Sequence, residues 1–435
     1  MSSPPLIRIF GIATTLSLIA MTPSSLFGQP AGFNYDESKV PTYTLPDPLA
    51  DLSGNRISNT RDWEHHRRRE VLGLFEKHVY GRTPSADSVA IRFQQQESTR
   101  GVLGGLGDRK QIRIHLERAG KRAAIDVLIY LPAGATGAVP LFVGLNFYGN
   151  HAAVDDPAVP LNQNWMRPVA SAGIVENRAT EASRTINTRR WPVADVLSRG
   201  YGIATIYCGD IDPDFDDGFK NGIHALFRAG DSPDVDDGEW STISAWAWGL
   251  SRAMDYFETD PFIDHQQVAV VGHSRLGKAS LWAGATDERF AIVVSNNSGC
   301  GGAALARRRF GETVQRINTN FPHWFNTTHK TYNGREDELP VDQHMLIALM
   351  APRPVYIASA TEDRWADPRG EFLAGKHAES VYALYKKEGL GVADQPPPDH
   401  PVGGHIGYHL RTGGHDILAY DWEQYMNFAD RHFGR

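Results

Sequence analysis

Residues 268–278 read V-A-V-V-G-H-S-R-L-G-K. Four apolar residues lead to a glycine, and Ser274 then stands directly before a segment with helical character. This order of strand, tight turn and helix is the setting of the G-x-S-x-G nucleophile elbow, which raises a serine above the edge of a sheet. The second glycine comes one residue late, as Gly277, so the motif departs from that pattern. A serine that caps a helix would give a similar local sequence, and the rest of the chain has to decide between the two.

The chain around this motif has the organisation of an α/β protein. Apolar, β-branched runs alternate with helical stretches from about residue 110 onward, which predicts a mostly parallel sheet with helices on both faces. Residues 30–70 indicate an extended arm and a first helix packed on this body. The expected strands are 124–131, 139–145, 202–207, 268–271, 291–295 and 354–358, and the expected helices are 244–258, 279–285 and 416–433.

The N-terminus has the pattern of an exported leader. Arg8 precedes a short apolar run, Ile9 to Met21, that is too short to span a bilayer comfortably. A retained membrane anchor is the alternative, since no A-x-A cleavage triplet follows. We expect a signal peptide over 1–28, a single catalytic domain with an N-terminal arm over 29–435, and a secreted or periplasmic monomer without stable membrane association.

Composition narrows the class of ligand. The net charge of -7 argues against a nucleic-acid partner. The two cysteines, Cys208 and Cys300, could form a disulfide in an oxidising compartment or remain as buried thiols. Neither a cysteine cluster nor an H-E-x-x-H motif is present in the sequence, so no metal and no other cofactor is expected.

Two long polar segments, 150–191 and 210–239, are expected to shape the substrate site. The second contains the acidic run D-I-D-P-D-F-D-D-G, which fails the spacing of an EF-hand calcium loop. Asp217 stands where that loop needs glycine, and Ile223 stands where it needs glutamate. A solvated loop or a helix cap is expected instead.

An acid and a histidine follow Ser274 in the order serine, acid, histidine that α/β-hydrolases use. The strand 354–358 leads into S-A-T-E-D-R-W-A-D-P, which places Glu362 and Asp363 just beyond the carboxyl end of the strand. His415 lies in the glycine-rich stretch R-T-G-G-H-D before the last helix. A serine hydroxyl needs an imidazole to take its proton, and a carboxylate must fix the tautomer of that imidazole. The sequence therefore predicts a triad of Ser274, Asp363 and His415.

Several other residues compete for these roles. Asp416 adjoins His415 and would point elsewhere, which makes it a poor orienting group. Three further histidines could act as the base, and each is expected on the surface or behind the site: His400, His405 and His409.

Four motifs together resemble those of the bacterial glucuronoyl esterases of carbohydrate esterase family 15: G-H-S-R-L-G-K, S-N-N-S-G-C-G-G-A-A-L, E-D-R-W-A-D-P and G-G-H-D. The likeness extends over most of the chain after about residue 40. It includes L-N-F-Y-G-N-H, ending at His151, and R-W-P-V-A-D-V-L-S-R-G-Y-G, ending at Gly202. The resemblance implies a three-layer αβα hydrolase fold. It also implies hydrolysis of esters of glucuronic acid or its 4-O-methyl ether, such as those that join glucuronoxylan to lignin alcohols. The late glycine is explained as well, since G-x-S-R-x-G-K is this family's own form of the elbow.

The same resemblance implies roles for individual residues. Ser274 would be the nucleophile and His415 the base, while Arg275 would supply the oxyanion hole through its backbone N–H and its guanidinium. The residues that match sugar contacts in the family are Lys278, Glu312 and Trp365. A cation and a carboxylate suit sugar hydroxyls, and an indole suits the apolar face of the ring. Without the resemblance, these three side chains would be interpreted as a solvated helix residue, a surface charge and a core residue.

One departure from the family concerns the acid. Many bacterial members carry an acidic residue within S-N-x-S-G-C-G-G, where this chain has Asn297. Asparagine cannot stabilise an imidazolium as a carboxylate does, so the task of orienting His415 should fall on Asp363. Two other functions stay open: an acetyl-xylan or other small-ester hydrolase with the same triad, and a carbohydrate-binding protein whose catalytic site has decayed.

Overall fold

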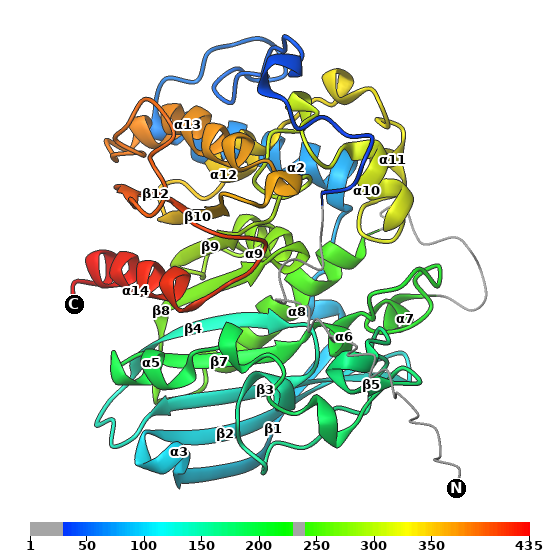
Figure 1. The fold of residues 1–435 in the computed structure, drawn as a ribbon, viewed down its shortest axis with the longest axis vertical. Helices are drawn as coiled ribbons and strands as arrows, with labels where there is room; N and C mark the ends of the chain where they lie inside the picture. The colour runs from blue at the N-terminus through cyan, green and yellow to red at the C-terminus, as the bar shows by residue number, and fades with distance from the viewer. Residues whose placement is uncertain (1–28, 229–239) are drawn as a thin grey trace, which may run out of the picture.

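The computed structural model describes residues 29–228 and 240–435 (Figure 1). The expected signal peptide therefore lies outside the described residues. Among the helices that the structure describes, none combines the length and the hydrophobicity that a membrane span requires.

Ten described strands form one sheet in the order β1-β2-β3-β7-β4-β8-β9-β10-β12-β11. The neighbours from β7 to β12 pair in parallel. Strands β1, β2 and β3 add an antiparallel edge, at the bottom of Figure 1, and β11 pairs antiparallel at the other edge. The strands are β1 (Ala90–Gly101), β2 (Gly107–Arg118), β3 (Lys121–Pro132), β4 (Val139–Asn146), β7 (Gly202–Tyr207), β8 (Ile263–His273), β9 (Ile292–Asn296), β10 (Val355–Ala360), β11 (Val402–Gly403) and β12 (Ile406–Arg411), with β5 (Ile174–Val175) and β6 (Arg178–Ala179) as a separate hairpin.

The predicted mostly parallel sheet is confirmed, but the hydrophobic pattern does not predict its antiparallel edge. Strand β1 reads A-I-R-F-Q-Q-Q-E-S-T-R-G, and its larger apolar side chains, Ile91 and Phe93, are only partly buried. An edge strand is paired on one side only and largely exposed, so its sequence carries a weak hydrophobic period.

Helices cover both faces of the sheet. On one face α2, α8, α9, α12 and α13 share an apolar core with Val268 and Val270 of β8; on the other, α5 and α14 share a core with Ala269 and Val271. Because successive side chains of a strand point to opposite faces, the buried run of β8 serves both cores, and the predicted three-layer αβα architecture is confirmed. The helices are α1 (Thr60–Asp62), α2 (Arg68–Phe75), α3 (Val102–Gly105), α4 (Asn150–Ala153), α5 (Val193–Ser198), α6 (Cys208–Ile211), α7 (His224–Phe227), α8 (Thr242–Phe257), α9 (Arg275–Thr286), α10 (Val314–Asn320), α11 (Thr327–Lys330), α12 (Gln343–Ala348), α13 (Pro368–Leu384) and α14 (Ala419–Phe433).

The N-terminal arm runs over the upper part of the molecule in Figure 1 before the first helix begins. That helix is longer than expected. It starts at Thr60 and continues to Tyr80 through π-helical turns at 63–67 and 76–80. The ring of Tyr80 stacks on Trp282 of α9 at 4.5 Å between centroids, so the first helix is fastened to the body next to the nucleophile helix.

Two expectations need correction, and the alternative left open for the two cysteines is resolved. The last helix begins at Ala419 rather than Asp416, because the carboxylate of Asp421 accepts the backbone N–H of Leu418 and caps the helix there. Cys208 and Cys300 are both free, buried thiols, so the disulfide alternative is not realised.

The acidic run from Asp210 is also not a solvated loop, because its first three aspartates are buried. Asp210 accepts hydrogen bonds from two asparagine amides, and Asp212 accepts one from Thr242. Asp214 contacts Arg275, the residue that follows the expected nucleophile. These carboxylates therefore hold loops together within the protein, and among the described residues no group of three or more His, Cys, Asp or Glu side chains is arranged to hold a metal ion.

Candidate active site

The turn between β8 and α9 holds Ser274 in a strained backbone conformation, with φ 58° and ψ -130°. Such a conformation is costly for a residue with a side chain and is typical of a nucleophile elbow. A Cβ atom on Gly272 would lie 2.0 Å from the carbonyl oxygen of Leu276, and a Cβ atom on Gly277 would lie 3.0 Å from the carbonyl oxygen of Gly272. The late glycine thus lets the first turn of α9 pack against the end of β8.

The structure brings the three residues of the expected triad together. The Nε2 atom of His415 lies 2.9 Å from the Oγ atom of Ser274, and its Nδ1 atom lies 2.6 Å from a carboxylate oxygen of Asp363. With the proton on Nδ1 shared with the carboxylate, Nε2 is free to accept the proton of the serine hydroxyl. These are the distances that general-base activation of a hydroxyl requires.

Four neighbouring strands supply the residues of this centre. Ser274 follows β8, Asn297 follows β9, Asp363 comes three residues after β10, and His415 comes four residues after β12. The carboxyl ends of parallel strands meet at one edge of a sheet, so strand order alone gathers these side chains.

Asn297 occupies the position where many family members have an acid, and it lies beside the carboxylate. Its backbone φ is 48°, and its backbone N–H donates to the carbonyl of Ala358 at 2.7 Å. Its side-chain amide donates to the same oxygen of Asp363 that contacts His415, at 2.8 Å. The Asn297 amide and the His415 ring thus both contact one carboxylate oxygen of Asp363.

Asp363 and Glu362 differ sharply in their surroundings. Asp363 is 5 % exposed and faces His415, whereas the side chain of Glu362 is exposed. The backbone N–H of Glu362 donates to the carbonyl of Gly413 at 2.9 Å and so supports the loop that carries His415.

Arg275 is the first residue of α9, so its backbone N–H has no partner within the helix. Its guanidinium pairs with Asp214 at 3.1 Å and lies over the rings of Phe147 and Trp324, 5.0 and 5.3 Å from their centroids. Burial acts to raise the pKa of Asp214, but Arg275 and hydrogen bonds from His323 and Trp324 hold that pKa well below its usual range. The Asp214 carboxylate therefore holds the Arg275 guanidinium against the rings of Phe147 and Trp324.

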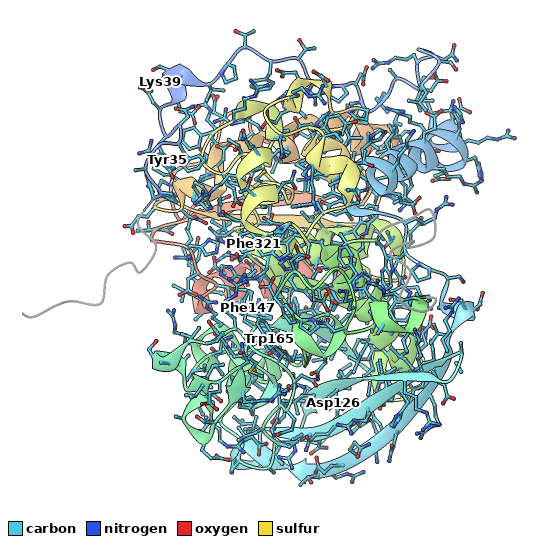
Figure 2. The ribbon with its side chains drawn as sticks, turned by 90° about the vertical axis from the view of Figure 1, so that its right-hand side faces the viewer. Tyr35, Lys39, Asp126, Phe147, Trp165 and Phe321 are labelled. Carbon is cyan, nitrogen blue, oxygen red and sulfur yellow. The ribbon has the colours of Figure 1, made fainter. Side chains whose placement is uncertain are left out.

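Aromatic side chains line this side of the molecule. Phe321 stacks on Trp324 with centroids 3.7 Å apart, and Figure 2 shows Phe321, Phe147 and Trp165 one below another on the same side. Of these rings, those of Phe147 and Trp324 contact the Arg275 guanidinium.

Lys278 and Glu312 form a charged corner next to the triad, in which Lys278 is buried and Glu312 is half-buried. Lys278 is 4 % exposed, and its ammonium donates to the carbonyl of Ser298, so it is not a solvated helix residue. Burial lowers the pKa of Lys278, although the negative charge of Glu312 opposes this. Burial likewise raises the pKa of Glu312 to about 7, although Lys278, His415 and Arg316 act to lower it. Lys278 and Glu312 thus lie within electrostatic reach of each other, and Glu312 lies within that of His415.

Trp365 is half-buried and belongs to the same corner through its backbone. Its carbonyl accepts the N–H of Glu312 at 3.0 Å, so the two segments are joined directly. The N-terminal arm completes the arrangement: the ring of Phe33 meets the Trp365 indole edge-on at 4.9 Å, and the carbonyl of Asn34 accepts the N–H of Gly311 at 2.8 Å.

The competing residues lie elsewhere. His400 is exposed, His405 is half-buried, and His409 is fully buried and bonded to Asp421 at 2.8 Å. Asp416 points away from the triad and pairs with Arg190 at 2.6 Å. The sequence offered little sign of these contacts, because the partners of Asp214, Asp416 and Asp421 come from distant segments.

Comparison with known proteins agrees with this geometry. A family model described as "Glucuronyl esterase, fungi" matches residues 235–385. Carbohydrate esterase MZ0003, from an unknown prokaryotic organism, is 54% identical over 407 residues, which is 94% of this chain and 94% of that protein. A solved structure described as a promiscuous CE15 esterase from the marine bacterial metagenome has a TM-score of 0.86 at 53% identity, covering 92% of this chain and 100% of that chain. A glucuronoyl esterase from Solibacter usitatus has a TM-score of 0.85 at 44% identity, covering 91% of this chain and 100% of that chain.

Proposed function

Because this chain belongs to carbohydrate esterase family 15, the family of the glucuronoyl esterases, we propose that it hydrolyses esters of glucuronic acid or 4-O-methylglucuronic acid. The observation that carries the proposal is the triad of Ser274, His415 and Asp363 close to the charged side chains of Lys278 and Glu312. The triad supports ester cleavage in general, and the charged corner supports recognition of a polyhydroxylated acyl group.

The reaction proceeds through an acyl-enzyme. His415 takes the proton of Ser274 as the hydroxyl attacks the ester carbonyl, and Asp363 stabilises the imidazolium that forms. The backbone N–H of Arg275 and its guanidinium stabilise the negative charge on the carbonyl oxygen. His415 then protonates the departing alcohol, and a water molecule activated by the same imidazole releases the uronate.

Recognition of the sugar falls to three side chains. The ammonium of Lys278 donates to ring hydroxyls, and the carboxylate of Glu312 accepts from them. The indole of Trp365 covers the apolar face of the ring, held in place by Phe33. This division of tasks suits a uronate ester within glucuronoxylan or joined to a lignin alcohol. We further propose that the protein is secreted by means of residues 1–28 and acts as a monomer.

The test is to compare initial rates of the purified protein on benzyl glucuronate, methyl galacturonate and an acetyl ester. We expect the highest kcat/KM on benzyl glucuronate. A preference for the acetyl ester would instead indicate a small-ester hydrolase on the same fold. Ser274→Ala should retain the fold and lose on the order of a million-fold in turnover, the typical effect of removing a triad nucleophile. Near-normal rates in a folded Ser274→Ala variant would exclude Ser274 as the nucleophile.

A further inference from the structure

The buried guanidinium of Arg411 contacts the backbone of the loop that carries His415. Arg411, at the end of β12, donates to the carbonyls of Thr412, Gly414 and Asp416 at 2.9–3.1 Å. Its Nε atom is fixed in turn by both carboxylate oxygens of Asp421. This inner contact sets the path of the backbone, but it touches carbonyl groups and not the histidine side chain.

A second contact holds the loop from the outside, one residue after the histidine. The carboxylate of Asp416 receives the Nε atom of Arg190 at 2.6 Å and a guanidinium nitrogen of Arg189 at 2.5 Å. The Asp416 side chain is 14% exposed and that of Arg190 is 20% exposed, whereas that of Arg189 is 64% exposed. The pair of Asp416 and Arg190 is therefore shielded from solvent, and such pairs are screened less by salt than exposed ones.

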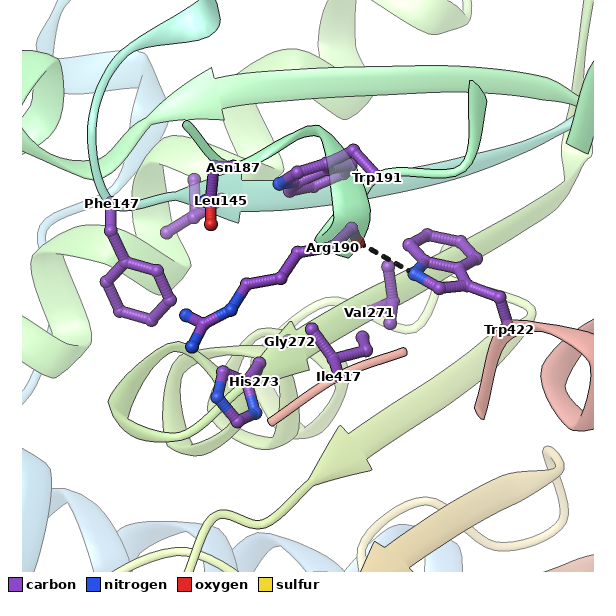
Figure 3. A pocket seen from close by; sticks show the side chains of 10 residues that line it. All are labelled: Leu145, Phe147, Asn187, Arg190, Trp191, Val271, Gly272, His273, Ile417 and Trp422. Carbon is purple, nitrogen blue, oxygen red and sulfur yellow. Dashed lines mark hydrogen bonds between the residues drawn. The ribbon is translucent and has the colours of Figure 1, made fainter. Parts of the chain in front are cut away.

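Arg190 itself has little freedom to move. Its carbonyl accepts the indole N–H of Trp422 at 2.9 Å, which fastens the backbone to α14 (Figure 3). Its side chain extends between Phe147 and His273, and its guanidinium carbon lies 5.9 Å from the centroid of the Phe147 ring.

The cavity around this guanidinium is only about 20 Å³ in volume, which suits about one water molecule and excludes a sugar or an alcohol. The cavity is therefore part of the framework behind the catalytic base rather than a substrate cleft. His273, which lines it, has its ring centroid 4.7 Å from that of His415.

We propose that Asp416 and Arg190 are positioning residues that hold His415 in register with Ser274 and Asp363, and that they connect the long 150–191 segment to the catalytic base. The proposal rests on the proposed function only in taking His415 as the base. On the N-terminal side of His415 the loop is held by hydrogen bonds to the carbonyls of Gly413 and Gly414, donated by the backbone of Glu362 and by Arg411. The Asp416 side chain supplies the fixed point on the other side.

The experiment compares Arg190→Gln and Asp416→Asn with the control Arg199→Gln. Arg199 donates to Asp430 at 2.6–3.0 Å, so the control also removes a partly buried Arg–Asp contact between a preceding segment and α14, away from the triad. Displacing a catalytic group by about 1 Å can lower a rate about a hundredfold. We expect a fall in kcat of roughly tenfold to a hundredfold for both test variants, on nitrophenyl acetate and on benzyl glucuronate alike, with KM little changed. Arg199→Gln should keep the wild-type kcat.

Two further measurements separate positioning from general stability. The double variant Arg190→Gln with Asp416→Asn should lose no more kcat than Asp416→Asn alone, and Arg190→Lys should recover part of the loss. The proton between His415 Nδ1 and Asp363 should give a far-downfield NMR signal in the wild type that broadens in Arg190→Gln but persists in Arg199→Gln. An unchanged kcat in folded Arg190→Gln and Asp416→Asn would overturn the proposal, as would losses confined to KM for the glucuronate ester. If the wild type cleaves nitrophenyl acetate but no glucuronate ester, the proposed substrate is wrong while the nitrophenyl acetate comparison still tests the positioning pair.

Discussion

The proposed catalytic residues and the proposed sugar-binding residues are positioned in different ways. Ser274, Asp363 and His415 each follow a parallel strand, so the sheet itself brings them to one edge. Glu312 and Trp365 instead lie in segments that are joined to each other by a backbone hydrogen bond and braced by the N-terminal arm. The proposed chemistry therefore depends on sheet order, whereas the proposed contacts of Glu312 and Trp365 with the sugar depend on segments that are remote in sequence.

This difference predicts how each region responds to substitution. A change among the strand-end residues should lower the rate for every ester, because all esters use the same nucleophile and base. A change in the braced segments should affect glucuronate esters selectively. A substrate pair of one glucuronate ester and one simple acetate therefore separates the two regions.

The largest effect within this comparison is expected from Asp363→Asn. The asparagine keeps the shape but leaves His415 without a carboxylate, so the imidazole can adopt the wrong tautomer and its charged form loses stabilisation. In a serine protease triad this change lowers turnover by about ten thousand-fold. The loss here should be somewhat smaller, since an alcohol leaves more easily than an amine, and kcat measured on both substrates should fall equally.

Glu362→Gln serves as the matched control, because Glu362 is the adjacent acid and its side chain is exposed. Its effect should be small. Adding Asn297→Glu to Asp363→Asn should restore part of the activity, since the Asn297 side chain already reaches the Asp363 carboxylate at 2.8 Å. If Glu362→Gln lowers kcat more than Asp363→Asn does, Glu362 rather than Asp363 orients His415.

The same difference explains what the sequence could predict. The strand before Ser274 and the strand before Asp363 are buried apolar runs, and their hydrophobic pattern indicates both the sheet and the residues at its edge. Strand β12, before His415, reads I-G-Y-H-L-R, and its polar side chains are buried because His409 and Arg411 both contact Asp421. That stabilisation comes from a helix further along the chain, so no local pattern reveals it. The proposed sugar-binding residues could be predicted only from the family resemblance. The contact of Phe33 with Trp365, for example, joins residues separated by most of the chain, so no local pattern indicates it.

Lys278→Ala should give a smaller and selective effect. Loss of one charged hydrogen bond costs roughly 1.5–3 kcal/mol, or roughly tenfold to a hundredfold in kcat/KM. We expect this loss on benzyl glucuronate and a much smaller one on nitrophenyl acetate, measured on the same preparation. The buried ammonium also donates to the carbonyl of Ser298, so an equal loss on both substrates would show that Lys278 supports the fold of the nucleophile region instead.

The smallest expected effect concerns the pH dependence of substrate preference. Burial raises the pKa of Glu312 to about 7, so its side chain is a neutral acid below that pH and a carboxylate above it. A carboxylate accepts hydrogen bonds from sugar hydroxyls more strongly than a neutral acid does, by roughly a factor of two in energy. The kcat/KM for benzyl glucuronate, divided by that for nitrophenyl acetate, should therefore rise several-fold as the pH increases through about 7. Dividing the two values removes the titration of His415, because both substrates use the same base.

Two variants make this last prediction specific to Glu312. In Glu312→Gln the ratio should stay flat with pH and remain near the low-pH value of the wild type, because glutamine carries no charge at any pH. In Lys278→Ala the rise should move to higher pH, since the ammonium of Lys278 acts to lower the pKa of Glu312 and its removal leaves burial less opposed. A pH-dependent ratio that persists in Glu312→Gln would assign the titration to another group. A flat ratio in the wild type would mean that Glu312 does not contact the sugar, and the recognition side would then rest on Lys278 and Trp365 alone.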